Sequence, residues 1–275
     1  MKKIVLSISF ILFAFLSFSQ KTDDRRTERD AKKEARRQKI DNLIRQQEEG
    51  ALIFNKQNVF GLRLNTDGWG LFYEKGYLKT ATTANLFALE FNEKKHPKEK
   101  KLNNVLNNNG FLQLGNPFVY GKRNSFYQLK LSYGQQRMLG AKANKNGVAI
   151  HAIYGGGFSA GLERPYYVRV QDPPGPNGPR DIKYSVADSA AFLEQNNIIM
   201  GTGLRYGWND MKFVPGVHAK AALRFDYGRF NETVAAIEVG LNLEAYSRKV
   251  EIMLLNPSQQ VFFNGYIAIL FGKRK

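Results

Sequence analysis

The 275-residue sequence contains no cysteine. This absence excludes a disulfide framework, a lipid-modified cysteine at the N-terminus, and thiol chemistry. Beyond the first twenty residues there is also no run of the ~18 consecutive apolar residues that a transmembrane helix requires. Histidine is scarce, with three in the chain, and no spacing of histidines and carboxylates is typical of a metal site. We therefore expect neither a metal nor another cofactor.

The residue patterns of known catalytic sites are missing as well. The chain has no nucleophile elbow and no glycine loop of the nucleotide-binding type, because no helix follows Gly155–Gly157. That triple glycine indicates a bend or a close backbone approach instead. His151 and Ser159 share one face of a predicted strand, but eight residues of strand separate them by about 26 Å. The sequence therefore predicts a protein that is not an enzyme.

The first residues have the pattern of a secretory signal peptide, which we place at residues 1–19. Lys2 and Lys3 precede a mostly apolar run from Ile4 to Leu16, and Ser17-Phe18-Ser19 is a small-x-small cleavage signal before Gln20. The chain is therefore expected to be exported.

Residues 20–56 are predicted to form a charged periplasmic helix or linker. From Lys21 to Glu49 there are ten Lys or Arg and eight Asp or Glu, with opposite charges at helical spacing. A solvated helix is the simplest interpretation. The alternative is a docking helix that binds a partner or plugs a barrel through three apolar residues, which are Ile40, Leu43 and Ile44.

The stretch 261–271 alternates with period two. One side is apolar and comprises Val261, Phe263, Gly265, Ile267, Ile269 and Phe271, whereas the other mixes aromatic, amide and small residues. In a soluble sheet the mixed side would face water. In an exported chain the inverse arrangement is favoured, with the apolar side toward lipid, as in the strands of an outer-membrane barrel.

Eight segments of this kind occur, and they predict an all-β fold over residues 57–275. The segments are 57–66, 69–78, 83–93, 125–139, 148–170, 213–228, 233–246 and 260–272. We interpret them as a transmembrane antiparallel up-and-down β-barrel that the last segment closes by pairing with the first. If 198–206 also crosses the membrane, ten strands are the alternative. A soluble lipocalin-like barrel is the competing interpretation.

The predicted connections differ in length between the two ends of the barrel. With residues 20–56 in the periplasm, the long connections 94–124, 171–212 and 247–259 lie outside the cell. The short connections 79–82, 140–147 and 229–232 lie in the periplasm, as is usual for bacterial barrels. Thr66-Asp67-Gly68 is predicted to form a tight outer hairpin.

The inward side of these segments contains four basic and five acidic residues. We expect this lumenal charge network to consist of Arg63, Glu74, Glu90, Lys130, Lys220, Arg224, Asp226, Glu238 and Glu244. Buried charges are tolerated when they are paired, and an eight-stranded barrel is just filled by its side chains. The pattern therefore predicts a filled interior rather than a water-filled pore.

The formal net charge is +17. In a cytosolic protein this balance would indicate nucleic acid, but export excludes that partner. We expect the basic residues to meet outer-membrane lipid, lipopolysaccharide, or acidic surfaces of other outer-membrane or periplasmic proteins.

Several motifs resemble a family of small outer-membrane β-barrel proteins common in Bacteroidota. They cover most of the chain after Gln57 and comprise LNTDGWG (64–70), HPKE (96–99), VYGKRNSFYQLKLSYG (119–134), KNGVAIHAIYGGG (145–157), MKFVPGVHAKAALRFDYG (211–228), AIEVG (236–240) and FGK (271–273). The resemblance implies an outer-membrane barrel and little about biochemistry, so no catalytic residue is carried over.

Two functional hypotheses follow. The first is a non-enzymatic barrel that acts as a structural or accessory subunit of an envelope complex, such as the outer-membrane protein insertion machinery or the type IX secretion and gliding apparatus. The second is a small transport or lipid-modifying outer-membrane barrel. The filled interior favours the first.

Overall fold

A computed structural model describes residues 29–38, 40, 55–80, 82–108, 111–142, 147–171, 178–228 and 232–275, with the backbone alone at 105–108 and 111–114. The chain divides into two compact units, Met1–Leu52 and Ile53–Lys275. In the first unit, residues 29–38 and 40 are helical, and Ile40 is exposed. Leu43, Ile44 and the predicted signal peptide at 1–19 lie outside the described residues. No helix in the described ranges is long and apolar enough to cross a membrane.

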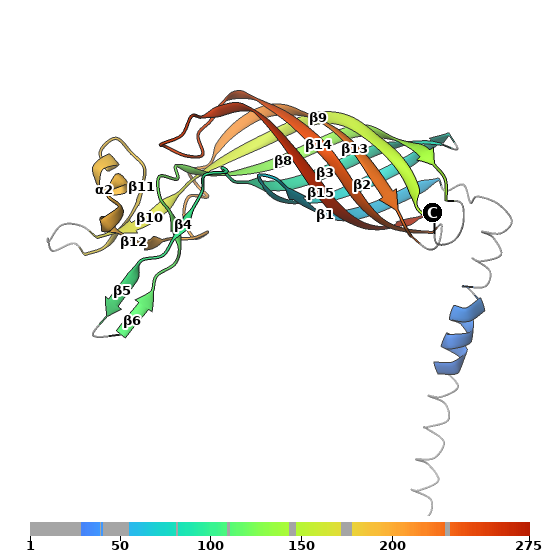
Figure 1. The fold of residues 1–275 in the computed structure, drawn as a ribbon, viewed down its shortest axis with the longest axis horizontal. Coiled ribbons are helices and arrows are strands. Elements are labelled where there is room, and N and C mark those ends of the chain that lie inside the picture. Colours follow the sequence, from blue (N-terminus) through green and yellow to red (C-terminus); the bar gives the residue numbers. More distant parts are fainter. Residues whose placement is uncertain are drawn as a thin grey trace, which may run out of the picture. The chain divides into compact units, whose positions relative to one another are not determined.

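The second unit is a closed barrel of eight antiparallel strands (Figure 1). The strands are β1 (Lys56–Asn65), β2 (Gly68–Thr80), β3 (Thr83–Lys94), β8 (Asn124–Gly140), β9 (Ala149–Pro165), β13 (Lys212–Asp226), β14 (Thr233–Val250) and β15 (Gln259–Arg274). Each strand pairs with the next one of this series, and β15 pairs with β1 from Asn65↔Tyr266 to Gln57↔Arg274. The predicted eight-stranded all-β barrel and its closure by the last strand are confirmed.

The register of the strands fixes the tilt of the barrel. Following the paired residues from Asn58 around the ring leads through Lys75, Phe87, Tyr133, Gly156, Ala219 and Leu243 to Phe263. On closure, however, Asn58 pairs with Lys273. The offset is 273 − 263 = 10 residues, which is the shear of the barrel. An eight-stranded ring with this stagger has strands tilted by about 40° and an interior that side chains fill.

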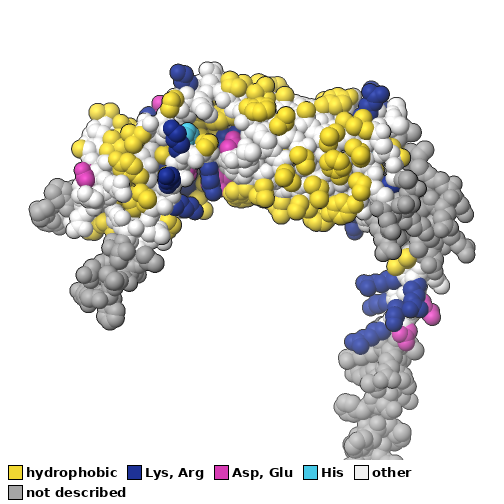
Figure 2. Space-filling model, viewed as in Figure 1, with side chains coloured by type: hydrophobic (Ala, Val, Ile, Leu, Met, Phe, Trp, Pro, Cys, Tyr) yellow, Lys and Arg dark blue, Asp and Glu magenta, His cyan; other side chains and the backbone are white. Residues whose placement is uncertain are grey.

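Side chains alternate strictly across the barrel wall. On β15 the outward residues are 47–69% exposed at Val261, Phe263, Ile267, Ile269 and Phe271, whereas the inward Phe262, Asn264, Tyr266, Ala268 and Leu270 are at most 7% exposed. Apolar side chains cover much of the barrel exterior in Figure 2. The exterior is therefore apolar while the interior holds charged residues, which is the inverse of a soluble lipocalin-like barrel.

The connections confirm the predicted asymmetry between the two ends for two of the three long connections. At one end, which we call the loop end, lie 95–123 after β3, 166–211 after β9, and 251–258 after β14, of which the first two are by far the longest in the barrel. At the opposite end, the turn end, the connections follow β2, β8 and β13, and the one after β8, 141–148, is as long as 251–258. The hairpin at Thr66 and Asp67 is the short connection at the loop end.

The loop-end connections contain their own folded module. β10 (Tyr167–Val170) pairs with β11 (Arg180–Lys183) and β12 (Ile198–Gly201) in a three-stranded sheet. Helix α2 (Ser189–Leu193) and the 3₁₀ turn η1 (Gln195–Asn197) join β11 to β12. The short strands β4 (Lys101–Leu102) and β7 (Phe118–Val119) pair with each other, as do β5 (Val105–Asn108) and β6 (Phe111–Leu114). The core of this loop module consists of Phe118, Val168, Val170, Ile182, Phe192 and Ile198.

Three predicted segments are corrected by this arrangement. The predicted strand 148–170 is two strands, because β9 ends at Pro165, which has no amide hydrogen for a ladder. The segment at 198–206 is not a membrane strand, since β12 pairs with β10 in the loop module. The alternative of ten barrel strands is therefore wrong. The predicted connection 94–124 begins with Lys94, which belongs to β3, and it forms part of the loop module.

The triple glycine marks a close approach of two barrel strands. A Cβ on Gly157 would lie 1.9 Å from the carbonyl oxygen of Leu131, and one on Gly155 would lie 2.6 Å from the Cα of Gly134. No side chain fits at these positions without moving the backbone of β8.

Candidate functional site

The middle of the barrel interior is occupied by a carboxylate between two cations. Arg63 Nη1 lies 2.7 Å from Glu90 Oε2, and Lys220 Nζ lies 2.8 Å from Glu90 Oε1. The Arg63 guanidinium carbon also lies 4.2 Å from the ring centre of Tyr266. Arg63 and Glu90 are each 1% exposed. Because such burial removes water from the charges, the ion pairs are what make the arrangement tolerable.

A second cluster surrounds Arg224. Its Nη1 and Nη2 atoms lie 2.7 and 2.8 Å from the two carboxylate oxygens of Glu74, a two-pronged pairing. Nη2 also lies 2.7 Å from Glu238 Oε2. The Tyr266 hydroxyl donates a 2.6 Å hydrogen bond to Glu238 Oε1. Arg224 thus connects β2 to β14 across the interior from its own place on β13.

A third cluster lies nearer the loop end, around Glu244. Its carboxylate oxygens lie 2.5 Å from Lys130 Nζ and 3.0 Å from Lys94 Nζ. Lys94 Nζ also lies 2.5 Å from Asp67 Oδ2 in the β1–β2 hairpin. Neither Lys94 nor Asp67 was predicted to belong to the network. The sequence pattern could have identified Lys94, because Lys94 continues the inward alternation of Glu90 and Asn92 one residue past the end of the predicted strand 83–93.

At the turn end, Asp226 forms salt bridges with Arg274 and, at 3.7 Å, with Lys142 Nζ. All nine residues predicted for the lumenal charge network are thus inside the barrel, and each is at most 7% exposed. The structure brings them together as three clusters and this fourth contact.

Toward the loop end the interior is closed by an apolar cluster of Val119, Phe126, Val214, Tyr246, Val250, Ile252, Met253 and Phe262. Chemically the interior is a plug of paired charges.

One polar contact inside the barrel was missed by sequence reasoning. His218 Nε2 lies 2.8 Å from Ser132 Oγ, and His218 Nδ1 lies 3.0 Å from Ser159 Oγ. A serine hydroxyl beside a histidine is the beginning of a nucleophilic site. Both ring nitrogens are engaged by hydroxyls here, however, and all three side chains are buried. The three residues lie on β8, β9 and β13, so no sequence spacing indicates the contact.

In the loop module, two ion pairs hold the three-stranded sheet. Arg169 Nε and Nη2 lie 2.7 and 2.9 Å from the carboxylate oxygens of Asp181, and these hydrogen bonds lower the pKa of Asp181. Asp210 accepts hydrogen bonds from Lys183 Nζ at 2.7 Å and from the Tyr167 hydroxyl at 2.8 Å, which lowers its pKa in the same way. Among the described residues, no group of three or more His, Cys, Asp or Glu is arranged to hold a metal ion.

No protein-family model matches the chain, and no curated protein matches it. Three solved structures to which it is similar are outer-membrane proteins. Neisserial surface protein A has a TM-score of 0.36 and 7% identity, over 80% of this chain and 94% of that one. Ail of Yersinia pestis, solved in complex with the heparin analogue sucrose octasulfate, has a TM-score of 0.35 and 8% identity, over 81% of this chain and 100% of that one. The N-terminal β-barrel domain of Pseudomonas aeruginosa OprF has a TM-score of 0.33 and 8% identity, over 80% of this chain and 98% of that one. These scores are too low to transfer any property.

The chain's own geometry therefore defines its class. A closed ring leaves no strand edge unpaired, so every barrel strand satisfies its backbone within the wall, as a hydrocarbon environment demands. The exterior is apolar and the charges are paired within. This is a transmembrane antiparallel up-and-down β-barrel with a filled interior and a folded module at its loop end.

Proposed function

We propose that this protein is a non-enzymatic barrel of the bacterial outer membrane that acts as a structural or accessory subunit of an envelope complex. In this role the barrel is an anchor, and the loop module is the surface that meets a partner outside the cell. The orientation follows from the predicted export signal and from the usual placement of long connections outside the cell.

The observation that carries the proposal is the combination of a plugged interior with a folded loop module. A conduit requires a continuous polar path, but Arg63, Arg224 and Glu244 occupy the interior with their partners. The loop module, by contrast, has a core of its own, centred on Val168, Val170 and Phe192, which are each at most 1% exposed. A chain that only spanned the membrane would need no such core.

We consider two assemblies as candidates for the complex: the outer-membrane protein insertion machinery, and the type IX secretion and gliding apparatus. Support comes from the motifs that resemble Bacteroidota barrels, among them LNTDGWG (64–70) and KNGVAIHAIYGGG (145–157). The charged segment at 20–56 adds a second surface on the periplasmic side.

The test is affinity purification of the full chain in mild detergent, followed by mass spectrometry. We expect an envelope protein to co-purify in stoichiometric amount. A matched variant, in which a Gly-Ser linker of equal length replaces residues 178–201, should remain a folded barrel and lose that partner. Recovery of the protein alone, at normal membrane levels, would remove the support for this function.

A transport or lipid-modifying barrel is the second candidate, and the Ser132–His218 contact is the observation in its favour. It requires either conductance in planar bilayers or an altered lipopolysaccharide profile after deletion of the gene. The Ser132→Ala variant should then reproduce the altered profile. The absence of conductance in planar bilayers, together with an unchanged lipopolysaccharide profile after deletion of the gene, rejects this candidate.

A further inference from the structure

One buried cation at the rim of the barrel lacks a counter-charge. Arg164 lies on β9, opposite Ser125 of β8, and is 3% exposed. Its Nε and Nη1 atoms are enclosed, and no described residue accepts a hydrogen bond from either. No carboxylate in the described ranges forms a salt bridge with it. The two other buried arginines among the described residues, Arg63 and Arg224, lie inside the barrel, and each has such a partner.

Aromatic rings surround this guanidinium on the outside of the barrel. Its Cζ atom lies 5.0 Å from the ring centre of Trp208 and 5.6 Å from that of Tyr127. Trp208 stacks on Tyr127, which in turn stacks on Phe91, with ring centres 6.0 Å apart in both pairs. Contacts of a cation with aromatic faces compensate only part of the cost of burying a charge. The described residues therefore compensate the charge of Arg164 only in part.

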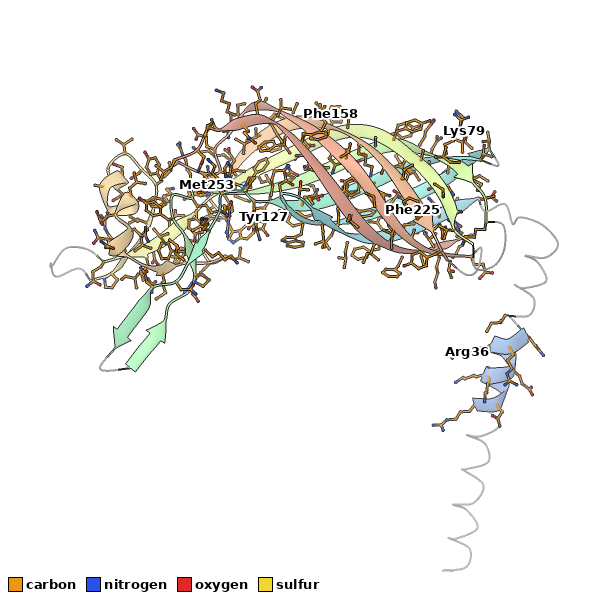
Figure 3. The ribbon with its side chains drawn as sticks, in the orientation of Figure 1. Arg36, Lys79, Tyr127, Phe158, Phe225 and Met253 are labelled. Carbon is orange, nitrogen blue, oxygen red and sulfur yellow. The ribbon has the colours of Figure 1, made fainter. Side chains whose placement is uncertain are left out.

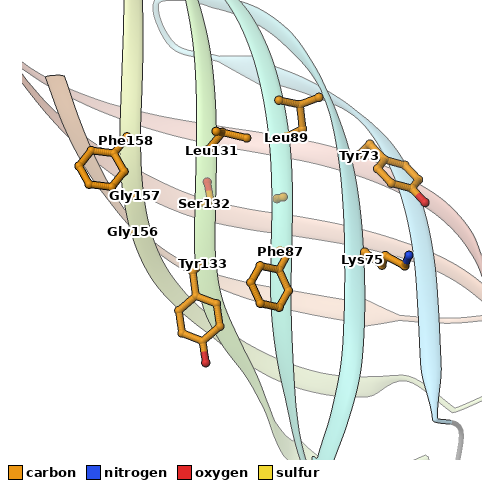
Figure 4. A pocket seen from close by; sticks show the side chains of 11 residues that line it. Tyr73, Lys75, Phe87, Leu89, Leu131, Ser132, Tyr133, Gly156, Gly157 and Phe158 are labelled. Atoms are coloured by element: carbon orange, nitrogen blue, oxygen red, sulfur yellow. The ribbon is translucent and has the colours of Figure 1, made fainter. Parts of the chain in front are cut away.

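The same strands have a hollow lower on their exterior. It has a volume of about 640 Å³ and is lined by outward residues of β2, β3, β8 and β9, including Phe87, Leu131, Tyr133 and Phe158. Figure 4 shows these side chains around Gly156 and Gly157, which contribute no side chain of their own. Gly156, which lies between the two glycines that let β8 and β9 approach, faces outward and leaves room on the lipid-facing surface.

The separation of the two features matches one leaflet of a membrane. Arg164 and Phe158 are six residues apart on β9 and point outward, so about 20 Å of strand separates them. At a tilt of about 40° this is a depth of about 15 Å, which is half of the ~30 Å hydrocarbon core. In Figure 3, Tyr127 lies near the loop end and Phe158 lies further toward the turn end, consistent with this order.

The rim beside Arg164 is basic. Lys94 ends β3 opposite Phe126, so Lys95 emerges next to Ser125, the register partner of Arg164. Lys98, Lys100 and Lys101 follow within the same segment and are exposed, whereas its one carboxylate, Glu99, is neutralised by Lys122 at 2.8 Å. Figure 2 shows Lys and Arg side chains gathered between the barrel and the loop module.

We propose that this rim binds a phosphate group of lipopolysaccharide, with Arg164 as the anchoring cation and the acyl chains extending down to the hollow above Gly156. The site rests on the proposed placement in the outer membrane, where the loop end meets the lipopolysaccharide leaflet. Trp208 lies in the connection between β9 and β13 rather than in the wall, and it uncovers the guanidinium by leaving its stack on Tyr127 and its 2.6 Å hydrogen bond to the Leu204 carbonyl oxygen. Its half-exposed ring then packs on a sugar of the head group.

The test uses the full chain, reconstituted in phosphatidylcholine vesicles, with purified short-chain lipopolysaccharide as the probe. Binding is measured as the rise in thermal unfolding midpoint with lipopolysaccharide concentration. We expect Arg164→Gln to raise the Kd about tenfold or more, which corresponds to about 1.4 kcal/mol. Arg164→Lys should retain part of the affinity, and dephosphorylated lipopolysaccharide should bind wild type as weakly as it binds Arg164→Gln. Arg169→Gln, which removes a paired cation of the loop module, is the matched control and should leave the Kd unchanged.

Three results would overturn the proposal. One is an unchanged Kd for Arg164→Gln. Another is equal stabilisation by phosphatidylglycerol, which would make an anionic phospholipid the occupant. The third is a lower unfolding midpoint for Arg164→Gln without lipopolysaccharide, which would make Arg164 a structural residue. Normal membrane levels and normal partner recovery of this variant separate a failure here from a failure of the proposed function.

Discussion

Arg224 and Glu74 are 150 positions apart in the sequence, and their side chains form two parallel hydrogen bonds of 2.7 and 2.8 Å inside the barrel. The two residues lie on β13 and β2, which are not neighbours in the ring. The pair therefore links opposite parts of the wall through the interior, rather than reinforcing one ladder.

Replacing Arg224 with Met should lower the free energy of unfolding by about 3–5 kcal/mol, because Glu74 and Glu238 would then be buried without their cation. Urea unfolding in vesicles, followed by tryptophan fluorescence, measures this change. Arg169→Met breaks the more exposed pair with Asp181 and should cost less than about 1 kcal/mol. Equal costs for the two variants would contradict the role of the interior network.

The close approach of β8 and β9 predicts a strong position effect among the glycines. Gly157→Ala places a Cβ 1.9 Å from the backbone oxygen of Leu131, so the strands must separate and the barrel should lose about 1–3 kcal/mol or fail to fold. Gly140→Ala meets nothing within 4 Å and should have little effect. The folded fraction of both variants can be measured on gels from the difference in mobility between unheated and heated samples. A Gly157→Ala protein as stable as wild type would refute the close contact between the two strands.

The outward residues of the closing strand are expected to decide membrane insertion. Ile269→Asp with Phe271→Asp puts two charges on the lipid-facing side, where apolar side chains are 47% and 58% exposed. We expect degradation in the periplasm and loss from the membrane fraction, since charge on this face is destabilising in a depth-dependent way. Ile269→Val with Phe271→Leu preserves the apolar face and should give normal levels. Normal membrane levels of the Ile269→Asp, Phe271→Asp double variant would contradict this prediction.

The ion pair of the loop module predicts a small dependence on pH. Hydrogen bonds from Arg169 hold the pKa of Asp181 below its ordinary value of 3.8. The stability that this pair contributes is therefore fully present above this ordinary value, which applies to the unfolded chain, and is lost as the pH falls through the lower folded value. Because the pair is partly exposed, the loss should be below about 1 kcal/mol. In a carboxyl NMR titration, Arg169→Gln should raise the pKa of Asp181 and leave that of Asp210 in place.

The alternation of residue types was sufficient to predict the barrel strands and the inward parity of the charges. A period of two places every second side chain on one face, so Arg63 and Glu90 were assigned to the interior before their partners were known. The predicted strand ends were less accurate. Lys94 was left out of β3, and 167–170 was added to β9, because alternation continues past Pro165 into the loop module.

The sequence predicted long connections at the loop end, but not the folded module within them. Its strands are four residues or shorter and pair across segments that the sequence separates by up to about 30 residues, so no local period identifies them. The contact of His218 with Ser132 and Ser159 was missed for the same reason, since three different strands supply it.

The sequence by itself determined the closing strand and the side of the wall on which each charge lies, because these depend on local periodicity and chain order, whereas the choice of eight strands over ten required the pairing of β12 with β10. The partner of each charge depends on the shear of ten residues, which the strands acquire only when the ring closes. Closure brings Arg224 to Glu74 and leaves Arg164 beside aromatic rings, with no carboxylate partner among the residues that the structure describes. Those relationships depend on which residues meet across the barrel interior. Such residues are far apart in the sequence, so no local pattern of the chain predicts the contacts.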